Sequence, residues 1–349
     1  MSPGTQQTPA VDAVDRKILQ ALQISPRLPF ALLAQVLDLS EQTVARRYRR
    51  LHREGVMRVT AVVNPAPLGQ SNWLMRVQCR PSGAGSLAQA LARRDDVSWV
   101  SLVGGGAEVV CILRARTQQA RDDLLIERLP RTTQVLGMSA AVVLHRFGAD
   151  EDEWSGLDGN LTPEQEAAVR EWVEPSLGLL GRVPSPANAS GEPDRPRLIA
   201  GDLAMLGLLV ADGRATYTAL AAAADTTQGR AVRRLRSLLA DGVAYLDVDF
   251  AMRTLGYACQ AVLWLTVAPA DLEPAGQRLS SFAEVVFTGA ITGAHNLSVT
   301  VVCRDLAALY AFVTEKVSTV DGVHAMEVSP VLRVVKQAGA MLVDDLLAG

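Results

Sequence analysis

The chain contains an internal repeat. When the 349-residue sequence is shifted against itself by 187 positions, residues 15–69 align without a gap with residues 202–256. Fifteen of the 55 aligned positions are identical, whereas chance would supply only a few. Similarity at a fixed spacing is typical of a duplicated module, so we expect one chain to carry two copies of the same unit. The identical pairs include Asp15/Asp202, Arg27/Arg214, Leu33/Leu220, Arg46/Arg233, Arg47/Arg234 and Gly55/Gly242.

Composition restricts the class of protein. Apolar residues make up 49% of the chain and charged residues 20%, which is enough for packed cores in two or more domains and argues against overall disorder. The first residues are polar, and no apolar run reaches the ~20 residues of a membrane span, so we expect a cytoplasmic protein without a signal peptide or membrane segment. The four cysteines form no C-x-x-C pair and are expected to be reduced.

The first part of each copy has the pattern of three short helices. In copy one, apolar residues at helical spacing mark residues 15–23 and 32–37, and a third, amphipathic helix is predicted over 41–54. Ser40 is placed to cap this helix through its hydroxyl group, and Gly55 stands where a left-handed residue ends it. Copy two repeats the pattern. Two helices joined by a short turn predict a helix-turn-helix, a motif that reads DNA.

The third helix is basic in both copies, although the net charge of the chain is −3. Arginine runs are usually solvated helix faces, but here the run falls on the third helix twice. In a helix-turn-helix, the N-terminal residues of the recognition helix meet base edges in the major groove, and other basic residues bind phosphate. We therefore predict double-stranded DNA as the partner. The predicted contacts are Ser40, Glu41, Gln42, Thr43, Arg46, Arg47 and Arg50 in copy one and Thr227, Gln228, Arg230, Arg233 and Arg234 in copy two, with Arg47, Arg50 and Arg234 assigned to phosphate.

After Gly69 the apolar period changes from helical to alternating. Each copy then predicts the order β-α-β-β-α-β, with a turn that contains glycine between the second and third strands. This is the ferredoxin-like arrangement, and it makes the fold class α+β. Two helices would cover one face of each sheet, and a second copy of the domain could cover the other. The predicted strands are residues 74–78, 97–103, 108–113 and 138–144 in copy one and 261–267, 284–291, 297–302 and 325–334 in copy two.

Two stretches separate the copies. Residues 181–197 hold four prolines, which remove backbone donors and favour an extended linker. Before them, Thr162 followed by Pro163 and, three residues after Thr162, Gln165 has the features of a helix start. A helix from Pro163 to Val173 is therefore predicted, and because it has no counterpart in the second half we expect it to bridge the modules.

Several short motifs occur in a fixed order. Copy one has Asp15, Ile18-Leu19, Arg27, Phe30 and Leu33-Ala34, followed by Leu39-Ser40-Glu41-Gln42-Thr43-Val44. Copy two has Thr292-Gly293-Ala294-His295-Asn296-Leu297 in its second part. In these motifs the chain resembles the leucine-responsive/asparagine regulator (Lrp/AsnC) family, whose patterns include Leu-Ser-x-x-Thr-Val and Thr-Gly-x-x-Asp-Leu. The resemblance covers nearly the whole chain apart from the N-terminus and the linker.

The resemblance implies a winged helix-turn-helix followed by a sensor domain that dimerises and, in many members, binds an amino acid or a similar metabolite. We therefore expect a transcription regulator rather than an enzyme, without a metal or other cofactor, that forms homo-oligomers through its sensor domains. The implied effector-binding residues are Gly105, Glu108, Gly293, His295, Asn296 and Leu297, with Asn296 in place of the family's Asp. The implied division is a disordered N-terminus (1–11), winged helix-turn-helix 1 (12–64), sensor domain 1 (65–150), bridging helix and linker (151–197), winged helix-turn-helix 2 (198–251) and sensor domain 2 (252–340).

Other classes of function have less support. No His, Cys or acidic residues stand at metal-ligand spacing, Gly104-Gly105-Gly106 leads into a strand rather than a helix, and no G-x-S-x-G motif occurs. One enzyme alternative is a siroheme decarboxylase, because a branch of the family resembles such enzymes and His295 stands at the corresponding turn. A third interpretation is a degenerate module that no longer binds DNA, which Gly229 inside a recognition helix favours.

Overall fold

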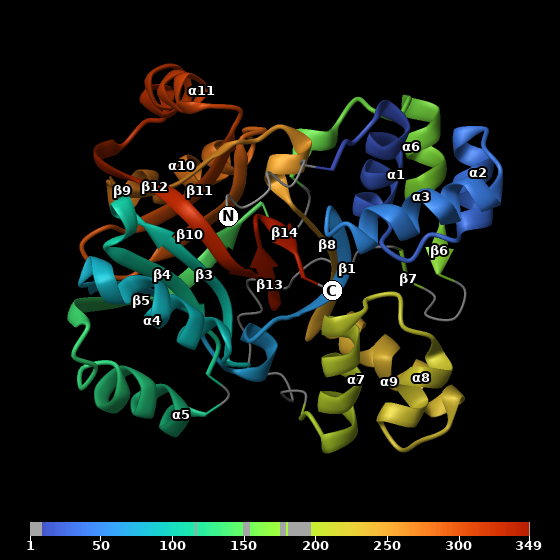
Figure 1. Ribbon diagram of the computed structural model, residues 1–349, viewed down its shortest axis with the longest axis horizontal. Coiled ribbons are helices and arrows are strands. Elements are labelled where there is room, and N and C mark those ends of the chain that lie inside the picture. The colour runs from blue at the N-terminus through green and yellow to red at the C-terminus, as the bar shows by residue number, and fades with distance from the viewer. Residues whose placement is uncertain (1–8, 116, 149–153, 175–178, 181–196, 349) are drawn as a thin grey trace, which may run out of the picture.

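Two three-helix units and a pair of packed sheets make up the protein (Figure 1). The computed structural model describes residues 9–115, 117–148, 154–174, 179–180 and 197–348. Most of the predicted disordered N-terminus and of the proline-rich linker lies outside the described residues. The first unit contains α1 (Ala13–Ile24), α2 (Phe30–Leu37), α3 (Glu41–Arg53) and β1 (Met57–Val63), and the second contains α7 (Ala200–Ala211), α8 (Tyr217–Ala223), α9 (Gln228–Ala240) and β8 (Ala244–Phe250).

The turns of the two units match at residues that are 187 positions apart. Asp38 after α2 and Asp225 after α8 both have a positive φ, of 53° and 49°. This left-handed conformation is uncommon outside glycine, and aspartate tolerates it better than most residues do. Gly55 and Gly242 take the same conformation after α3 and α9, which confirms the predicted end of the third helix. The units therefore share backbone geometry as well as sequence.

Strands β1 and β8 pair with each other in an antiparallel two-stranded ribbon. Thr60 lies opposite Asp247, its own counterpart in the repeat, and Met57 lies opposite Phe250, the counterpart of Val63. The register is therefore symmetric about the centre of the ribbon. The predicted wing within each unit is not what the structure has. Each unit supplies one strand here, and the backbone groups of a single strand find their partners in the other unit.

Two arginines at equivalent positions of the repeat join the units reciprocally. Each guanidinium group donates hydrogen bonds to two backbone carbonyl groups of the opposite unit and lies over an aromatic ring there. The partners are Gly213, Ala215 and the ring of Tyr217 for Arg27, and Pro26, Leu28 and the ring of Phe30 for Arg214, with hydrogen bonds of 2.7–3.0 Å and distances to the ring centroids of 4.9 and 4.7 Å. This exchange repeats the symmetry of the ribbon.

Gly213 marks a close backbone approach between the units. Its N–H group donates to the carbonyl oxygen of Val59 (2.9 Å), and a Cβ atom added at Gly213 would lie 2.8 Å from the backbone nitrogen of Thr60. We expect Gly213→Ala to lower the free energy of unfolding by about 1–3 kcal/mol, because neither backbone segment can move without breaking that hydrogen bond. Urea denaturation measures this. The control is Gly207→Ala in α7, where a Cβ atom meets nothing within 4 Å and helix propensity favours alanine. Equal stability of the two variants would contradict this account of Gly213.

Eight strands from the two halves close into a ring. Around the ring the order is β12-β3-β4-β2-β5-β10-β11-β9, and β9 pairs again with β12. The long strands β5 and β12 close the ring because each pairs with strands of both halves. The strands are β2 (Trp73–Cys79), β3 (Val97–Val103), β4 (Glu108–Leu113), β5 (Val135–Phe147), β9 (Cys259–Val267), β10 (Val285–Ile291), β11 (Leu297–Cys303) and β12 (Val323–Gln337), followed by β13 (Ala340–Val343) and β14 (Leu346–Leu347).

The ring has two faces with separate cores. Its outer face carries helices α4 (Pro81–Ala92), α5 (Gln118–Asp122), α10 (Leu272–Ser280) and α11 (Leu306–Ala311), as Figure 1 shows on its left side. Alternate strand residues point outward to these helices or inward to the opposite sheet. The inward core contains Leu74, Val110, Val262, Trp264 and Ile291, drawn from both halves. The prediction that a second copy of the domain covers the free face of the first sheet is thus confirmed, within one chain.

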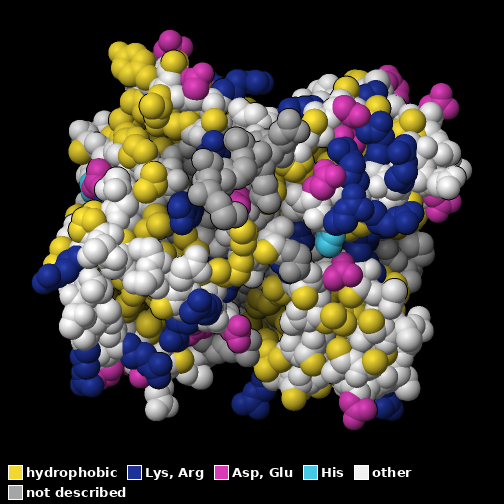
Figure 2. All heavy atoms as spheres, viewed as in Figure 1, with side chains coloured by type: hydrophobic (Ala, Val, Ile, Leu, Met, Phe, Trp, Pro, Cys, Tyr) yellow, Lys and Arg dark blue, Asp and Glu magenta, His cyan; other side chains and the backbone are white. Residues whose placement is uncertain are grey.

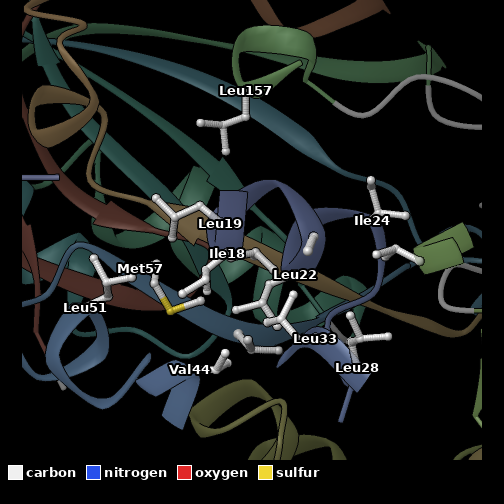
Figure 3. Packing of buried hydrophobic residues seen from close by; sticks show 14 of the residues in the cluster. Ile18, Leu19, Leu22, Ile24, Leu28, Leu33, Val44, Leu51, Met57 and Leu157 are labelled. Carbon is white, nitrogen blue, oxygen red and sulfur yellow. The ribbon is translucent and has the colours of Figure 1, made fainter. Parts of the chain in front are cut away.

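Helix α6 (Pro163–Arg170) begins at Thr162 with the predicted capping box. The expectation that it bridges the modules is wrong, because it packs on α1 and α2 of the first unit. Val169 and Leu157 are fully buried in the core of that unit, beside the α1 side chains Ile18, Leu19 and Leu22, several of which Figure 3 shows. The helices of the described residues are all too short or too polar to cross a membrane.

Candidate functional site

The N-terminal turn of α3 is open to solvent. Ser40 caps the helix by accepting a hydrogen bond from the N–H group of Thr43, and the two hydroxyl groups lie 2.8 Å apart. Glu41, Gln42 and Arg46 are exposed. Val44 and Leu51, on the opposite face, are fully buried in the core of the unit (Figure 3). The amphipathic helix therefore presents its predicted base-reading residues to solvent and holds itself in place with the other face.

The arginines assigned to phosphate have partners within the protein. Asp15, whose side chain is completely buried, accepts hydrogen bonds from Arg47 (2.8 Å) and Arg50. In the second unit Asp202 accepts two hydrogen bonds from Arg234, at 2.8 and 2.9 Å. Burial opposes the ionisation of Asp202, but the hydrogen bonds from Arg234 and a backbone N–H group outweigh it and hold the pKa below its usual range. These arginines therefore anchor the third helix of each unit to its first helix.

Asp15 offers a test of that anchoring role. We expect Asp15→Ala to lower the free energy of unfolding by about 3 kcal/mol, because Arg47 and Arg50 both lose a buried carboxylate and only Arg47 keeps a close second one, Asp12. Asp202→Ala is the matched variant, and it should cost less because only Arg234 loses its partner. Urea denaturation of both variants measures the difference. An unchanged stability of Asp15→Ala would mean that Arg47 and Arg50 do not serve as anchors.

The N-terminal turn of α9 differs from that of α3. Thr227 stands at the capping position, but its side chain makes no capping hydrogen bond. Gln228, Gly229, Arg230 and Arg233 are exposed. Figure 2 shows Lys and Arg side chains gathered over the α1–α3 unit, whereas the visible face of the α7–α9 unit is largely apolar and uncharged. The two surfaces therefore present different chemistry to a partner.

One predicted effector residue from each half, Glu108 and His295, belongs to a single chain of polar contacts. Arg76 on β2 donates hydrogen bonds to the carboxylates of Glu108 and Glu327, with shortest distances of 2.6 Å to each, and its guanidinium lies 4.4 Å from the centroid of the Trp264 ring. Glu327 lies 3.6 Å from Nε2 of His295. Hydrogen bonds from Arg76 hold the pKa of Glu327 below its usual range. Glu108 and His295 are thus connected through Arg76 and Glu327, which sequence reasoning did not identify.

Two of the predicted effector residues, Asn296 and Leu297, make contacts that hold the fold together. The side-chain amide of Asn296 accepts from the N–H group of Val267 (2.8 Å) and donates to its carbonyl oxygen (2.7 Å). A carboxylate could not make the second bond, which explains why asparagine fits here. Leu297 is fully buried in the core under α10 and α11. Gly105 and Gly293 are exposed with φ of 70° and 114°, so these two turns are the open part of the predicted site.

Sequence reasoning also missed two arginines at the other end of the ring. On β4 the inward face carries Glu108, Val110 and Ile112, and the next inward position along the chain is Arg114. Arg114 lines a cavity of about 180 Å³ between the sheets, together with Arg146 at the end of β5. The alternation pattern contained the signal, because it places a charged residue on an otherwise apolar face.

Metal and thiol chemistry find little support in the residues that the structure describes. No group of three His, Cys, Asp or Glu side chains in that part of the chain is arranged to hold a metal ion. All four cysteines are free, and burial raises the pKa of the Cys111 thiol to about 12. A thiol with such a pKa is protonated at neutral pH and is a poor nucleophile or ligand.

Comparison with known proteins identifies two domains. The AsnC-type helix-turn-helix domain matches residues 11–52, and the Lrp/AsnC ligand binding domain matches residues 260–341. An uncharacterized HTH-type transcriptional regulator of Pyrococcus horikoshii is 32% identical over 142 residues, which are 40% of this chain and 87% of the relative. The HTH-type transcriptional regulators LrpA of Pyrococcus abyssi (27% over 139 residues) and AldR of Mycolicibacterium smegmatis (27% over 154 residues) match 39% and 42% of this chain and 99% and 90% of their own lengths.

Similar solved structures extend over almost the whole chain. Two crystal structures of the siroheme decarboxylase NirDL, one of them in co-complex with an iron-uroporphyrin III analogue, cover 94% of this chain and 93% of their own. Their TM-scores are 0.59 and 0.61 at 13% sequence identity, so the likeness is one of fold. Both matched domains and the relative that is 32% identical point the same way, and the chain therefore belongs to the Lrp/AsnC family.

Proposed function

We propose that this chain is a sequence-specific DNA-binding transcription regulator in which one polypeptide carries two helix-turn-helix units. The observation that carries the proposal is the ribbon of β1 and β8, whose register is symmetric about Thr60 and Asp247. This symmetry relates α3 and α9 by an approximate twofold axis. Dimeric regulators use such an axis to place two recognition helices in successive major grooves.

A tandem duplication of the helix-turn-helix is part of this proposal. The family's helix-turn-helix profile matches only residues 11–52, so the role of α7–α9 rests on geometry. Three features support it: the left-handed residues at equivalent positions, the reciprocal contacts of Arg27 and Arg214, and the repeated pairing of the first helix with the third through Asp15 and Asp202. We also place the domain boundaries where the sequence predicts them, without a wing inside each unit.

The proposed reading surface consists of the exposed residues of the two N-terminal turns. Arg46 and Arg233, which are equivalent in the repeat, are exposed and suited to a bidentate contact with guanine or to a phosphate contact. Gln42 and Gln228 carry amides that pair with adenine. Ser40, Glu41, Thr43, Thr227 and Arg230 complete the surface, while Arg47, Arg50 and Arg234 mainly orient the helices.

The third helices of the two units present different residues, so we expect a DNA operator with two different half-sites. A homodimer presents identical helices and prefers a palindrome, but here Gln42-Thr43 stands against Gly229-Arg230. We therefore expect selection from random DNA to return two different half-sites about one helical turn apart. A perfect palindrome would contradict this refinement without affecting DNA binding itself.

A salt titration of DNA binding tests the proposal. A regulator should bind its promoter region more tightly than random duplex, with an affinity that falls steeply as salt rises from 50 to 200 mM, a range over which a protein with several phosphate contacts loses orders of magnitude. Fluorescence anisotropy with both duplexes measures this. Equal affinity for promoter and random DNA at every salt concentration would rule out sequence-specific regulation.

Control by a small molecule and homo-oligomer formation also belong to the proposal. The open glycine turns at Gly105 and Gly293, with the nearby Glu108–Arg76–Glu327–His295 contacts, are the surface where an amino acid or related metabolite is proposed to bind. Leu306 and Tyr310 on α11 are 70% and 71% exposed, which leaves an apolar strip for association between chains. Size-exclusion chromatography with light scattering measures the oligomeric state.

A siroheme decarboxylase is the second candidate, because the solved structures that share the fold over 94% of the chain are those of such an enzyme. The volume between the sheets is about 180 Å³, below the roughly 300–1,000 Å³ of sites for drug-sized ligands. A tetrapyrrole is larger still, so this ring would have to open to admit one. Turnover of siroheme by the purified chain, in the absence of DNA binding, would favour the enzyme.

A further inference from the structure

The space between the two sheets is closed differently at its two ends. At the end near the glycine turns, Arg76 is held between the carboxylates of Glu108 and Glu327. At the other end, near the ribbon, the cavity of about 180 Å³ is lined by Arg114 and Arg146. Glu108 and Arg114 are six positions apart along strand β4 and its continuation, which corresponds to roughly 20 Å. The ribbon end is therefore a separate site from the predicted effector turns.

The two arginines of this cavity are not matched by carboxylates in contact. Arg114 donates to the side-chain oxygen of Asn72 (3.1 Å) and to the carbonyl oxygen of Val63 (3.3 Å). Arg146 donates to the hydroxyl oxygen of Tyr245 (2.9 Å). In the described part of the chain no Asp or Glu oxygen lies within 4.0 Å of either guanidinium, in contrast to Arg76, Arg47 and Arg234. Both side chains line the cavity between the sheets.

The charge of the cavity favours an anion. Burial lowers the pKa of Arg114, and the charge of Arg146 lowers it further, so its surroundings disfavour an unpaired cation there. Tyr245 and Asp247 raise the pKa of Arg146, which therefore stays charged in the cavity. Asp247 also lines the cavity, but one of its carboxylate oxygens accepts from the N–H group of Val248. Two arginines and one aspartate leave an excess of one positive charge. Tyr245 accepts from Arg146, so its own hydroxyl proton is available to donate.

The other residues that line the cavity indicate the chemistry of the rest of the ligand. Leu74, Ile112, Val143, Val262 and Phe287 provide apolar walls. The volume of about 180 Å³ is below that of sites for drug-sized ligands, which limits the occupant to a small molecule. Planar guanidinium groups bind carboxylates through paired hydrogen bonds. We propose that the ribbon end of the ring binds a small aliphatic carboxylate, held by Arg114, Arg146 and Tyr245.

The position of this site couples it to the DNA-reading units. Arg114 contacts Val63, the last residue of β1, and Arg146 contacts Tyr245, the second residue of β8. A carboxylate bound to both arginines brings both strands of the ribbon under the control of one ligand. Because the ribbon joins the two three-helix units, ligand binding shifts their relative orientation or its spread. This effect, but not the binding site, rests on the proposed function.

Calorimetric titration of the full chain with acetate, 3-methylbutanoate and succinate tests the site. We expect saturable binding of at least one of these acids, and none by 3-methylbutanamide, the uncharged isostere of the second. Arg114→Lys and Arg146→Lys keep the positive charge but lose the planar guanidinium group that forms paired hydrogen bonds. Each substitution should weaken binding of the acid about tenfold or more. Arg131→Lys, an exposed arginine that does not line the cavity, is the control and should leave the affinity unchanged.

A second measurement does not depend on the variants' folding. Phenylglyoxal modifies accessible arginines, and the bound acid should protect Arg114 and Arg146 from it in the wild-type chain, as read by mass spectrometry. Equal binding of acid and amide, absence of saturable binding by all three acids, or protection confined to other arginines would overturn the site. Because titration and protection need no DNA, they remain decisive even if the chain proves not to bind DNA. Anisotropy with and without the acid then tests the coupling alone.

Discussion

Replacing both Arg46 and Arg233 with alanine should lower the affinity for an operator duplex by a factor of 100 or more. Each of these exposed arginines stands at the same position of a proposed recognition helix, and loss of one base-reading arginine costs about 1–3 kcal/mol. The salt dependence should also become shallower, because fewer phosphate counterions are released. Fluorescence anisotropy between 50 and 200 mM salt measures both effects.

The control for this pair removes the same charge elsewhere. Arg128 and Arg131 are exposed arginines of the first sheet domain, with side chains 66% and 78% accessible. Alanine at both should change operator affinity by less than threefold, since long-range attraction is screened at these salt concentrations. Neither double variant should lower the melting temperature. If both double variants lose the same affinity, DNA binding depends on net charge and not on the proposed reading surface.

The second large effect concerns pH. Asp249 on β8 is buried, and this burial, with Asp247 nearby, raises the pKa of its carboxyl group to about 7. Below pH ~4 both the folded and the unfolded chain hold the proton. Between about pH 4 and 7 the unfolded chain releases it and the folded chain keeps it, so the stability of the folded chain falls as pH rises, by about 1.4 kcal/mol per unit for this group alone. Above pH 7 both are ionised and the loss is complete.

Asp249→Asn should remove this loss. Gln337 donates a 3.2 Å hydrogen bond to the Asp249 side chain, and the oxygen of asparagine can accept the same bond. At pH 8 the variant should therefore be more stable than the wild type by up to about 4 kcal/mol, and at pH 4 the two should agree. Urea denaturation across this range measures the difference. Asp321→Asn, at an exposed carboxylate, is the control and should track the wild type at every pH.

Local structure was largely predictable from the sequence, because the relevant forces act within a few residues. The helical periodicity around Val44 and Leu51 predicted α3, and Ser40 and Gly55 predicted where it begins and ends. Alternation predicted the strands of both sheet domains to within a few residues. The repeat also implied that one sheet domain covers the other, since each copy leaves one apolar face without a partner.

Pairing between distant segments was not predictable in the same way. Nothing in the periodicity of β1 distinguishes a strand that pairs within its unit from one that pairs with β8. Likewise, the strands β5 and β12 close the ring through their extra length, and alternation over 138–144 and 325–334 did not indicate that these strands continue into a second sheet. Such contacts depend on the folded arrangement of both halves.

The resemblance to the family predicted the position of the site but not the role of each residue in it. It located the turns at Gly105 and Gly293, but not that Asn296 binds the backbone of Val267 or that Leu297 belongs to a core. Charge alone could not separate Arg47, which pairs with Asp15, from the exposed Arg46. The available signal was the spacing between Asp15 and Arg47, which recurs between Asp202 and Arg234. This spacing can be interpreted only when the first and third helices of each unit are known to touch.

The symmetric ribbon affects how the occupancy of a DNA operator depends on the amount of protein in the cell. A regulator assembled from separate subunits dissociates on dilution, so at low copy number its active form falls with the square of the amount made. Here the axis through Thr60 and Asp247 relates two segments of one polypeptide, and no dilution can separate them. If each chain reads its operator alone, half-occupancy should scale with the first power of the protein level. Few copies of the protein would then be enough to occupy the operator. A mutation in one of the two third helices would change the preferred sequence of one half-site and leave that of the other unchanged.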